Sequence, residues 1–226
     1  MLLADGQGLS SSPKGAARWT KRQSREYNSG MVRPSATEID RLKQVAQEVR
    51  DSTEESGFHV DVAVGQHEAF TQSEGPASLL ERTLVLDAAQ RGASQAGFGI
   101  ERLSGSLDLL ATGGTTLRRY RVKRITLNKE GVYGAICGAG SALLVSDPES
   151  IFTEEKWIFG YITADDHTID SLVAAEIVGW DGDGPVRLRF GTVIDLSEHK
   201  PPRGFVSTDE GLDGFEDDGK SDREVG

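Results

Sequence analysis

Residues 172–196, LVAAEIVGWDGDGPVRLRFGTVIDL, decide the fold class of this chain. Two mostly apolar runs flank residues 181–184, DGDG, which tolerate the backbone conformations of a tight turn. In the second run apolar and basic side chains alternate with the period of a β-strand: Val186, Leu188 and Phe190 against Arg187 and Arg189. The stretch therefore predicts an antiparallel hairpin with an apolar face and a charged face. It contains no catalytic motif.

The chain is acidic overall, but its charge is unevenly distributed. The formal net charge is −11 over 226 residues. Residues 1–34 have a net charge of +4 and residues 205–226 a net charge of −6, and both segments have few apolar residues. Chains of that composition do not bury a core. We therefore predict a disordered basic arm over residues 1–34, a single β-rich α+β domain over 35–204 and a disordered acidic tail over 205–226.

Cysteine content and hydropathy limit the cellular setting. Cys137 is the only cysteine, which excludes an intrachain disulfide and a zinc site built from cysteines. The apolar start of residues 1–13 is too short for a signal-peptide core. The longest uncharged run, residues 131–146, is shorter than the about 20 apolar residues of a spanning helix. These features predict a cytoplasmic protein that does not contact membranes.

Two helices are predicted before the sheet. The first begins at Ser35, because Ser35 and Glu38 have the spacing of a capping box, and Gly57 ends this region. Its buried stripe is Ile39, Leu42, Val45, Ala46 and Val49. The second begins at Pro76, with Gly92 as its stop. Its inward residues are expected to be Leu79, Leu80, Thr83 and Leu84.

The remaining pattern is that of short strands. Residues 58–64 alternate like a half-buried strand, and Gly113-Gly114 is predicted to join strands over 106–112 and 115–127 in a hairpin. Further strands are predicted over 132–137, 141–146 and 156–163, and from residue 172 onward. Short connections between successive strands favour antiparallel pairing. The predicted fold class is α+β, with two N-terminal helices and a mainly antiparallel sheet that can close into a barrel or a sandwich.

Residues 118–124, RRYRVKR, place five cations in seven positions. On a strand, Arg119, Arg121 and Lys123 share a face at a spacing of roughly 6.6–7 Å, which suits phosphates or carboxylates. Arg187 and Arg189 form one patch with them if both strands share a sheet and face the same way. The alternative is that these charges only keep the sheet soluble and protect its edges. The candidate binding residues are Arg118, Arg119, Arg121, Lys123, Arg124, Arg187 and Arg189.

Other candidate sites are weaker. A zinc-type site could use imidazole and carboxylate ligands from His59, Asp61, His67 and Glu68, although H-E-x-x-H is incomplete because position 71 is Thr. Cys137 lies among small and apolar residues, the usual surroundings of a packing thiol, although a fold could bring His59 or His67 to it as a base. No G-x-G-x-x-G, P-loop or G-x-S-x-G motif occurs, and no cofactor is expected.

The leading hypothesis is a non-enzymatic interaction module whose basic strand face binds an anionic partner, either an acidic protein surface or nucleic acid. The overall acidity favours a protein. The acidic tail could also fold back over the basic face and compete with an outside ligand. A metal-dependent hydrolase is the second hypothesis. The third is a structural subunit, with self-association, that exposes Trp157, Phe159 and Tyr161 to a neighbour.

Overall fold

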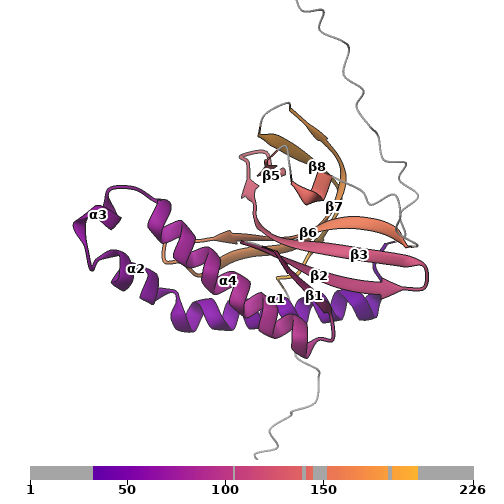
Figure 1. Ribbon diagram of the computed structural model, residues 1–226, viewed down its shortest axis with the longest axis horizontal. Helices are drawn as coiled ribbons and strands as arrows, with labels where there is room; N and C mark the ends of the chain where they lie inside the picture. Colours follow the sequence, from indigo (N-terminus) through magenta and orange to yellow (C-terminus); the bar gives the residue numbers. More distant parts are fainter. Residues whose placement is uncertain (1–32, 104, 139–140, 145–151, 183–184, 198–226) are drawn as a thin grey trace, which may run out of the picture.

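The computed structural model describes residues 33–103, 105–138, 141–144, 152–182 and 185–197. Within these residues a helical layer covers one face of an eight-stranded sheet, so the fold class is α+β (Figure 1). The predicted basic arm, apart from residues 33 and 34, and the predicted acidic tail lie outside the described residues.

The helices come first in the chain: α1 (Ala36–Ser56), α2 (Phe58–Val64), α3 (Glu68–Thr71) and α4 (Gly75–Gln95). Helix α1 begins where the sequence predicts, because the Ser35 hydroxyl accepts a hydrogen bond of 3.2 Å from the backbone amide of Glu38. The Glu38 carboxylate contacts Arg118 and Tyr120 of the sheet. None of these helices is long and apolar enough to cross a lipid bilayer.

Helices α1 and α4 pack tightly against each other because α4 presents small residues. A Cβ atom on Gly92 would lie 3.0 Å from Val45 Cα and 3.0 Å from Glu48 Cβ of α1. Gly92 therefore does not end α4, as the sequence had suggested, but permits the close approach of the two helices. The expected inward face of α4 was also wrong: Leu79 is 63% exposed and Leu80 37% exposed. Thr83 is exposed and Leu84 half-buried, and α4 buries Glu81, Val85, Leu86, Ala88, Ala89, Gly92 and Ala93 instead.

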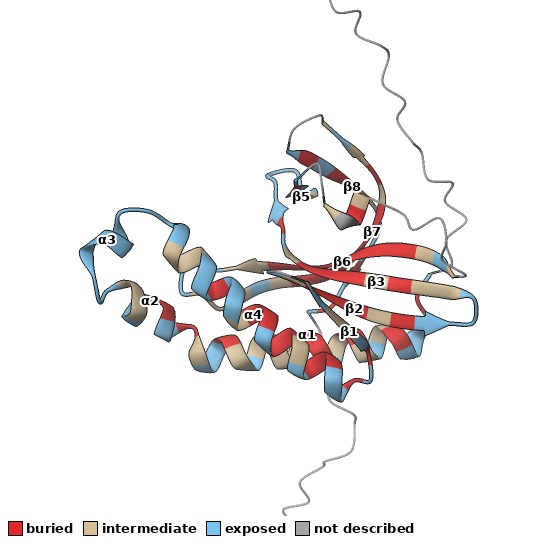
Figure 2. Ribbon diagram, in the orientation of Figure 1, coloured by how far each residue is buried: buried red, intermediate tan, exposed pale blue. Residues whose placement is uncertain are grey.

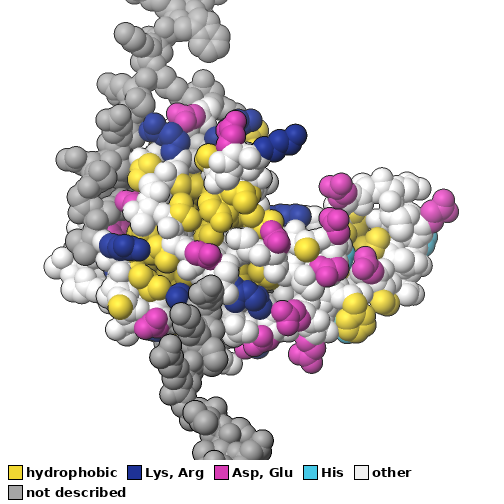
Figure 3. Space-filling view, turned by 180° about the vertical axis from the view of Figure 1, so that it is seen from behind, with side chains coloured by type: hydrophobic (Ala, Val, Ile, Leu, Met, Phe, Trp, Pro, Cys, Tyr) yellow, Lys and Arg dark blue, Asp and Glu magenta, His cyan; other side chains and the backbone are white. Residues whose placement is uncertain are grey.

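Residues 58–64 form α2, so the predicted strand there was wrong. Gly57 has helical dihedral angles (φ −56°, ψ −39°) and does not stop the helical path. Val60 is buried, and Phe58 and Val62 point outward. The alternating pattern predicted a strand, but α2 lies beside helices and not at the edge of the sheet, so a helix satisfies its backbone. Helices α2 and α3 project beyond the sheet, and this end of the molecule is largely exposed (Figures 2 and 3).

The strands form one open sheet in the order β1-β2-β3-β6-β7-β8-β5-β4. Their bounds are β1 (Gly99–Leu103), β2 (Ser106–Gly113), β3 (Thr116–Arg124), β4 (Thr126–Leu127), β5 (Tyr133–Cys137), β6 (Thr153–Thr163), β7 (Ile169–Asp181) and β8 (Val186–Asp195). All pairs are antiparallel except β3 and β6, which run parallel. The β7–β8 hairpin is the one predicted from residues 172–196, although β7 begins earlier, at Ile169.

Each face of the sheet carries its own apolar core. On the helical face, α1 and α4 pack on alternate side chains of the central strands, which include Tyr120, Trp157, Phe159 and Leu172. On the other face the sheet curves away from the helices, and β5, β7, β8 and the 3-10 turn η1 (Ala142–Leu144) enclose a second core (Figure 1). This core contains Ile158, Val173, Val186 and Leu188.

Three finer expectations need correction. The described sheet is open, so it forms neither a barrel nor a sandwich. Residues 142–144 form a 3-10 turn, and residues 145 and 146 of the predicted strand 141–146 lie outside the described residues. Trp157, Phe159 and Tyr161 are at most 2% exposed, because β6 is a central strand covered by helices (Figure 2). They therefore do not form the exposed aromatic stripe of the structural-subunit hypothesis.

Candidate functional site

The basic run forms β3, and its cations alternate between the two faces of the sheet. Arg118 and Arg124 share the helical face with Tyr120. Arg119, Arg121 and Lys123 share the other face, as the strand period predicts. They align with Lys156, Ile158 and Gly160 of β6 in the parallel register, and Ile158 belongs to the second core.

Arg118 is committed to the interior of the protein. Its guanidinium donates hydrogen bonds to Glu155 at 2.6 Å and to Glu38 at 2.7 Å, and all three residues are buried. The Tyr120 hydroxyl donates to the same Glu38 carboxylate at 2.8 Å. Burial alone would lower the pKa of Arg118, but Glu38 and Glu155 outweigh it and raise that pKa. These contacts tie α1 to the centre of the sheet.

Arg119 and Arg121 are also neutralised inside the chain. The Asp108 side chain is 1% exposed, and its carboxylate accepts hydrogen bonds from Arg121 through both Nε and Nη2. Arg119 reaches Asp108 at 2.9 Å, Glu154 at 2.7 Å and Glu101. Burial would lower the pKa of Arg119, but the hydrogen bonds to these carboxylates raise it. The two guanidinium groups therefore hold β1, β2, β3 and β6 together.

Arg187 and Arg189 do not join the β3 cations. Val186 and Leu188 point into the second core, so the residues between and after them lie on the opposite face of the sheet. Arg187 is exposed, and Arg189 packs over Gly179 with its Nε 3.8 Å from the Asp181 carboxylate. The five cations share one sheet but face opposite ways, so the condition for a single patch is not met.

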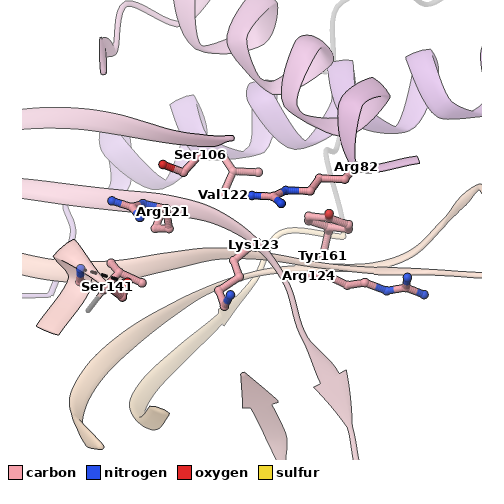
Figure 4. A pocket seen from close by; sticks show the side chains of 9 residues that line it. Arg82, Ser106, Arg121, Val122, Lys123, Arg124, Ser141 and Tyr161 are labelled. Carbon is pink, nitrogen blue, oxygen red and sulfur yellow. Dashed lines mark hydrogen bonds between the residues drawn. The ribbon is translucent and has the colours of Figure 1, made fainter. Parts of the chain in front are cut away.

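A small cationic pocket lies at the end of β3, beyond the last residue that pairs with β2 (Figure 4). Its volume is about 210 Å³, and its walls are Arg82, Ser106, Arg121, Val122, Lys123, Arg124, Ser141, Leu143 and Tyr161. The pairing of β2 with β3 stops at Asp108 and Arg121, although β2 begins at Ser106, so residues 122–124 of β3 are not paired with β2. The pocket therefore opens at an edge of β3 that a neighbouring strand covers elsewhere.

The cations reach this edge from both sides of the strand. Arg82 extends from α4 past Tyr161 toward Val122 (Figure 4). It donates a hydrogen bond to the carbonyl of Gly105, whose φ is +71°. Lys123 extends from the opposite side of β3, on the side of Ser141, and Arg124 points away from both. Arg124 lies 3.5 Å from the Glu81 carboxylate and 3.5 Å from the Ser78 hydroxyl. Arg82 and Lys123 therefore line the pocket from opposite sides of β3.

Lys123 differs from the other four cations of β3, each of which forms an ion pair with a carboxylate. It is half-buried, and no carboxylate of the described residues forms an ion pair with it. Burial is the main cause that lowers the pKa of Lys123; nearby Cys137 opposes it, and repulsion from Arg82 and Arg121 lowers that pKa further. On the helical side, burial raises the pKa of Tyr161 to about 12, so its hydroxyl is a hydrogen-bond donor at neutral pH. Together these groups can bind a single anionic group.

The residues of the metal hypothesis do not come together. His59 and Asp61 lie two positions apart on α2, about 200° around the helix, and not on one face of a strand. His67 caps α3 through its Nδ1, which accepts a hydrogen bond from the Ala69 amide at 3.1 Å, and Glu68 is exposed. Among the described residues, no group of three His, Cys, Asp or Glu side chains is placed to hold a metal ion.

Asp61 instead takes part in a link between α2, α4 and the β6–β7 turn. The His167 ring lies between two carboxylates, with its Nε2 3.2 Å from Asp61 and its Nδ1 3.3 Å from Glu81. Glu81 is buried and also accepts a hydrogen bond of 2.7 Å from Thr163. His167 has a φ of +63°, as expected for a turn residue. This cluster positions α4, and with it Arg82, over the end of β3.

Cys137 is buried in the second core. Burial raises the pKa of its thiol, although nearby Lys123 lowers it. His67 caps α3 and His59 lies exposed on α2, and neither belongs to the pocket lining beside Lys123. The thiol therefore behaves as a packing residue.

Sequence reasoning missed Arg82, Tyr161 and Ser141, which belong to elements far from β3 in the chain. Arg82 is the only Lys or Arg between residues 51 and 90. The sequence therefore shows an isolated cation, but it does not show that this side chain lies beside β3. No family model matches this chain, and no curated protein or solved structure shows significant similarity to it.

Proposed function

We propose that this domain is a non-enzymatic interaction module that binds an acidic segment of a protein partner at the cationic pocket. The observation that supports the proposal is Lys123, which is half-buried between Arg82 and Arg121 with no carboxylate partner among the described residues. Leaving a cation in that position costs stability in the free protein. A bound carboxylate would compensate this charge and raise the pKa of Lys123 again.

The size of the pocket and the charge of the chain favour a protein ligand over nucleic acid. A volume of about 210 Å³ accommodates one carboxylate head group with a few waters. Binding along nucleic acid depends on a row of available cations, but Arg119 and Arg121 of this row are engaged with Asp108, Glu101 and Glu154. A formal net charge of −11 also repels an extended polyanion.

Binding at the basic face is best tested by substitution of Lys123, because Arg119 and Arg121 also hold the fold together. Reversing Arg119 and Arg121 to Glu would leave the buried Asp108 carboxylate among like charges, so a loss of binding would report a loss of folding. Lys123→Gln removes a charge without removing an ion pair that the structure shows. Lys129→Gln is the matched control, because Lys129 is an exposed lysine in the turn between β4 and β5, outside the pocket.

The probe is a fluorescent octapeptide of Asp and Glu, with its Asn and Gln counterpart as the neutral control. Fluorescence anisotropy with the full chain is expected to show binding of the acidic peptide alone, which weakens between about 50 and about 300 mM salt. Lys123→Gln is expected to weaken it about tenfold, as the loss of one charge-assisted contact implies, and Lys129→Gln less than about twofold.

Equal affinities for the wild type and Lys123→Gln, or binding that salt does not change, would refute the proposal. A single-stranded oligonucleotide forms the second arm of the assay. If it binds more tightly than the acidic peptide and loses affinity with Lys123→Gln, the pocket serves nucleic acid and not an acidic protein segment.

A further inference from the structure

The projecting helical end carries exposed apolar side chains in acidic surroundings. We call residues 51–80 the helical tip; they comprise the end of α1, all of α2 and α3, and the start of α4. The tip has five of the nine large apolar side chains that are exposed among the described residues: Phe58, Val62, Phe70, Leu79 and Leu80. Its six carboxylates are all exposed, and it contains no Lys or Arg. Figure 3 shows hydrophobic side chains on this projection with Asp and Glu around them.

The best-defined part of this surface is one face of the helical path from α1 into α2. Phe58 is 56% exposed and Val62 52% exposed, and they lie four residues apart on α2. Because Gly57 has helical dihedral angles, the same spacing extends back to Glu54, and Asp61 lies one turn after Phe58. Phe58 and Val62, with Glu54 one turn before them, therefore lie exposed on the side of α2 opposite the buried Val60, whereas Asp61 contacts His167.

The negative charge of the helical tip favours a positively charged binding partner. We infer that the helical tip is a docking surface for a basic amphipathic helix of a partner protein. The apolar residues of that helix would cover Phe58 and Val62, and its Lys and Arg side chains would meet exposed carboxylates of the tip, which include Glu54, Glu55 and Glu68. A second copy of this chain would place acid against acid, and an anionic membrane surface would repel the tip.

The inference is independent of the proposed function. The pocket at Lys123 binds an acidic ligand, whereas the tip binds a basic one, and neither Lys123 nor Arg82 belongs to the tip. Lys123→Gln therefore leaves binding at the tip unchanged. Phe58→Ser with Val62→Ser leaves binding of the acidic octapeptide unchanged, so either proposal can fail without the other.

The probe is a labelled 18-residue peptide of Leu and Lys, about 18 residues being five helical turns, with Leu at helical spacing. A scrambled peptide of the same composition is the control for charge alone. Anisotropy is measured with the full chain, with Phe58→Ser/Val62→Ser, and with Val132→Ser/Ile136→Ser. The last pair is a matched control, because Val132 and Ile136 are 58% and 56% exposed and lie outside the tip.

We expect the tip variant to bind the amphipathic peptide at least about tenfold more weakly and the control variant to bind it within about twofold of the wild type. Glu54→Gln/Glu55→Gln/Glu68→Gln is expected to weaken binding more than Glu130→Gln/Asp170→Asn/Asp195→Asn, which removes three exposed carboxylates elsewhere. Equal losses in the two triple variants, or equal binding of the scrambled peptide, would show attraction by net charge only and overturn the inference.

Two further measurements test the other occupants. Sedimentation equilibrium overturns the inference if the wild type dimerises and the tip variant does not, since the surface is then a contact between copies. The chain's own basic segment is tested by replacing Lys14, Arg18, Lys21, Arg22 and Arg25 with Gln in the full chain. If this raises peptide affinity about tenfold in the wild type and not in the tip variant, the segment occupies the tip and the inference of a partner is wrong.

Discussion

Replacing Asp108 with alanine is expected to lower the free energy of unfolding by about 3–5 kcal/mol. Asp108 is 0% exposed, and its two carboxylate oxygens accept hydrogen bonds from Arg121 and Arg119. Arg119 retains Glu101 and Glu154 after the substitution. Arg121 loses the one carboxylate with which the structure pairs it, and its side chain is 10% exposed. The cost is therefore that of one uncompensated, largely buried guanidinium.

Urea unfolding followed by circular dichroism measures the effect. The free energy of unfolding of a single domain is about 5–15 kcal/mol, so the expected loss is a large fraction of the total. Glu101→Ala is the comparison, because its side chain is 40% exposed and Arg119 keeps two other carboxylates. A loss below about 1 kcal/mol is expected for that variant.

A double-mutant cycle with Arg121→Met separates the ion pair from other effects of the substitution. If the cost of Asp108→Ala comes from the unpaired guanidinium, the double variant is more stable than the sum of the single effects implies, by about 2 kcal/mol or more. A loss under about 1 kcal/mol for Asp108→Ala, or single effects that simply add, would refute the reasoning.

The remaining predictions concern packing, thiol reactivity and pH. Replacing a helical Gly by Ala normally stabilises a helix by about 1 kcal/mol. In Gly92→Ala, however, the new Cβ would lie 3.0 Å from Val45 Cα and 3.0 Å from Glu48 Cβ, so we expect the free energy of unfolding in urea to fall by about 1–3 kcal/mol. A gain in stability would contradict the close packing. Burial raises the pKa of the Cys137 thiol, so iodoacetamide is expected to modify it at least about 100-fold more slowly in folded than in unfolded protein, by mass spectrometry; similar rates would contradict its burial. Lys123→Met is expected to stabilise the protein by up to about 1 kcal/mol at neutral pH. Because burial lowers the pKa of Lys123 in the folded state, the unfolded chain binds this proton more tightly, and the wild type gains stability as pH rises from the lowered pKa toward 10.5. The stability difference between the two proteins should therefore shrink over that range, and a constant difference would contradict the lowered pKa.

Local sequence patterns predicted the parts of the fold that local forces determine. The Ser35 cap fixes the start of α1 because the donor and the acceptor lie three residues apart. The turn at residues 181–184 joins two runs that can pair with each other without the rest of the chain, and β7 and β8 form that hairpin. Gly113 and Gly114 act in the same way between β2 and β3, and Gly114 has a φ of +60°.

Patterns failed where distant packing decided the outcome. Residues 58–64 alternate like a strand, but they emerge from α1 through a helical Gly57 and pack beside α4 instead of pairing with a strand of the described sheet. Leu79 and Leu80 look like core residues, yet the part of α4 that contains them projects beyond the sheet. Whether an apolar residue is buried depends on what lies opposite it, and the sequence around it does not contain that information.

The candidate site was also incompletely predicted, because the sequence does not show which carboxylates lie opposite the cations of β3. The dense basic run of β3 predicted a binding face. In the structure, however, Arg118, Arg119 and Arg121 form ion pairs with carboxylates from α1, β1, β2 and β6. A buried cation without a carboxylate partner has a large desolvation cost. A dense basic run inside a folded sheet therefore predicts internal ion pairs first, and a ligand only where such a pair is missing. The informative cation is Lys123, which forms no ion pair with a carboxylate of the described residues. In the proposed function, an anion that enters the pocket would compensate the half-buried ammonium group, so the stability of the protein would rise when the ligand binds.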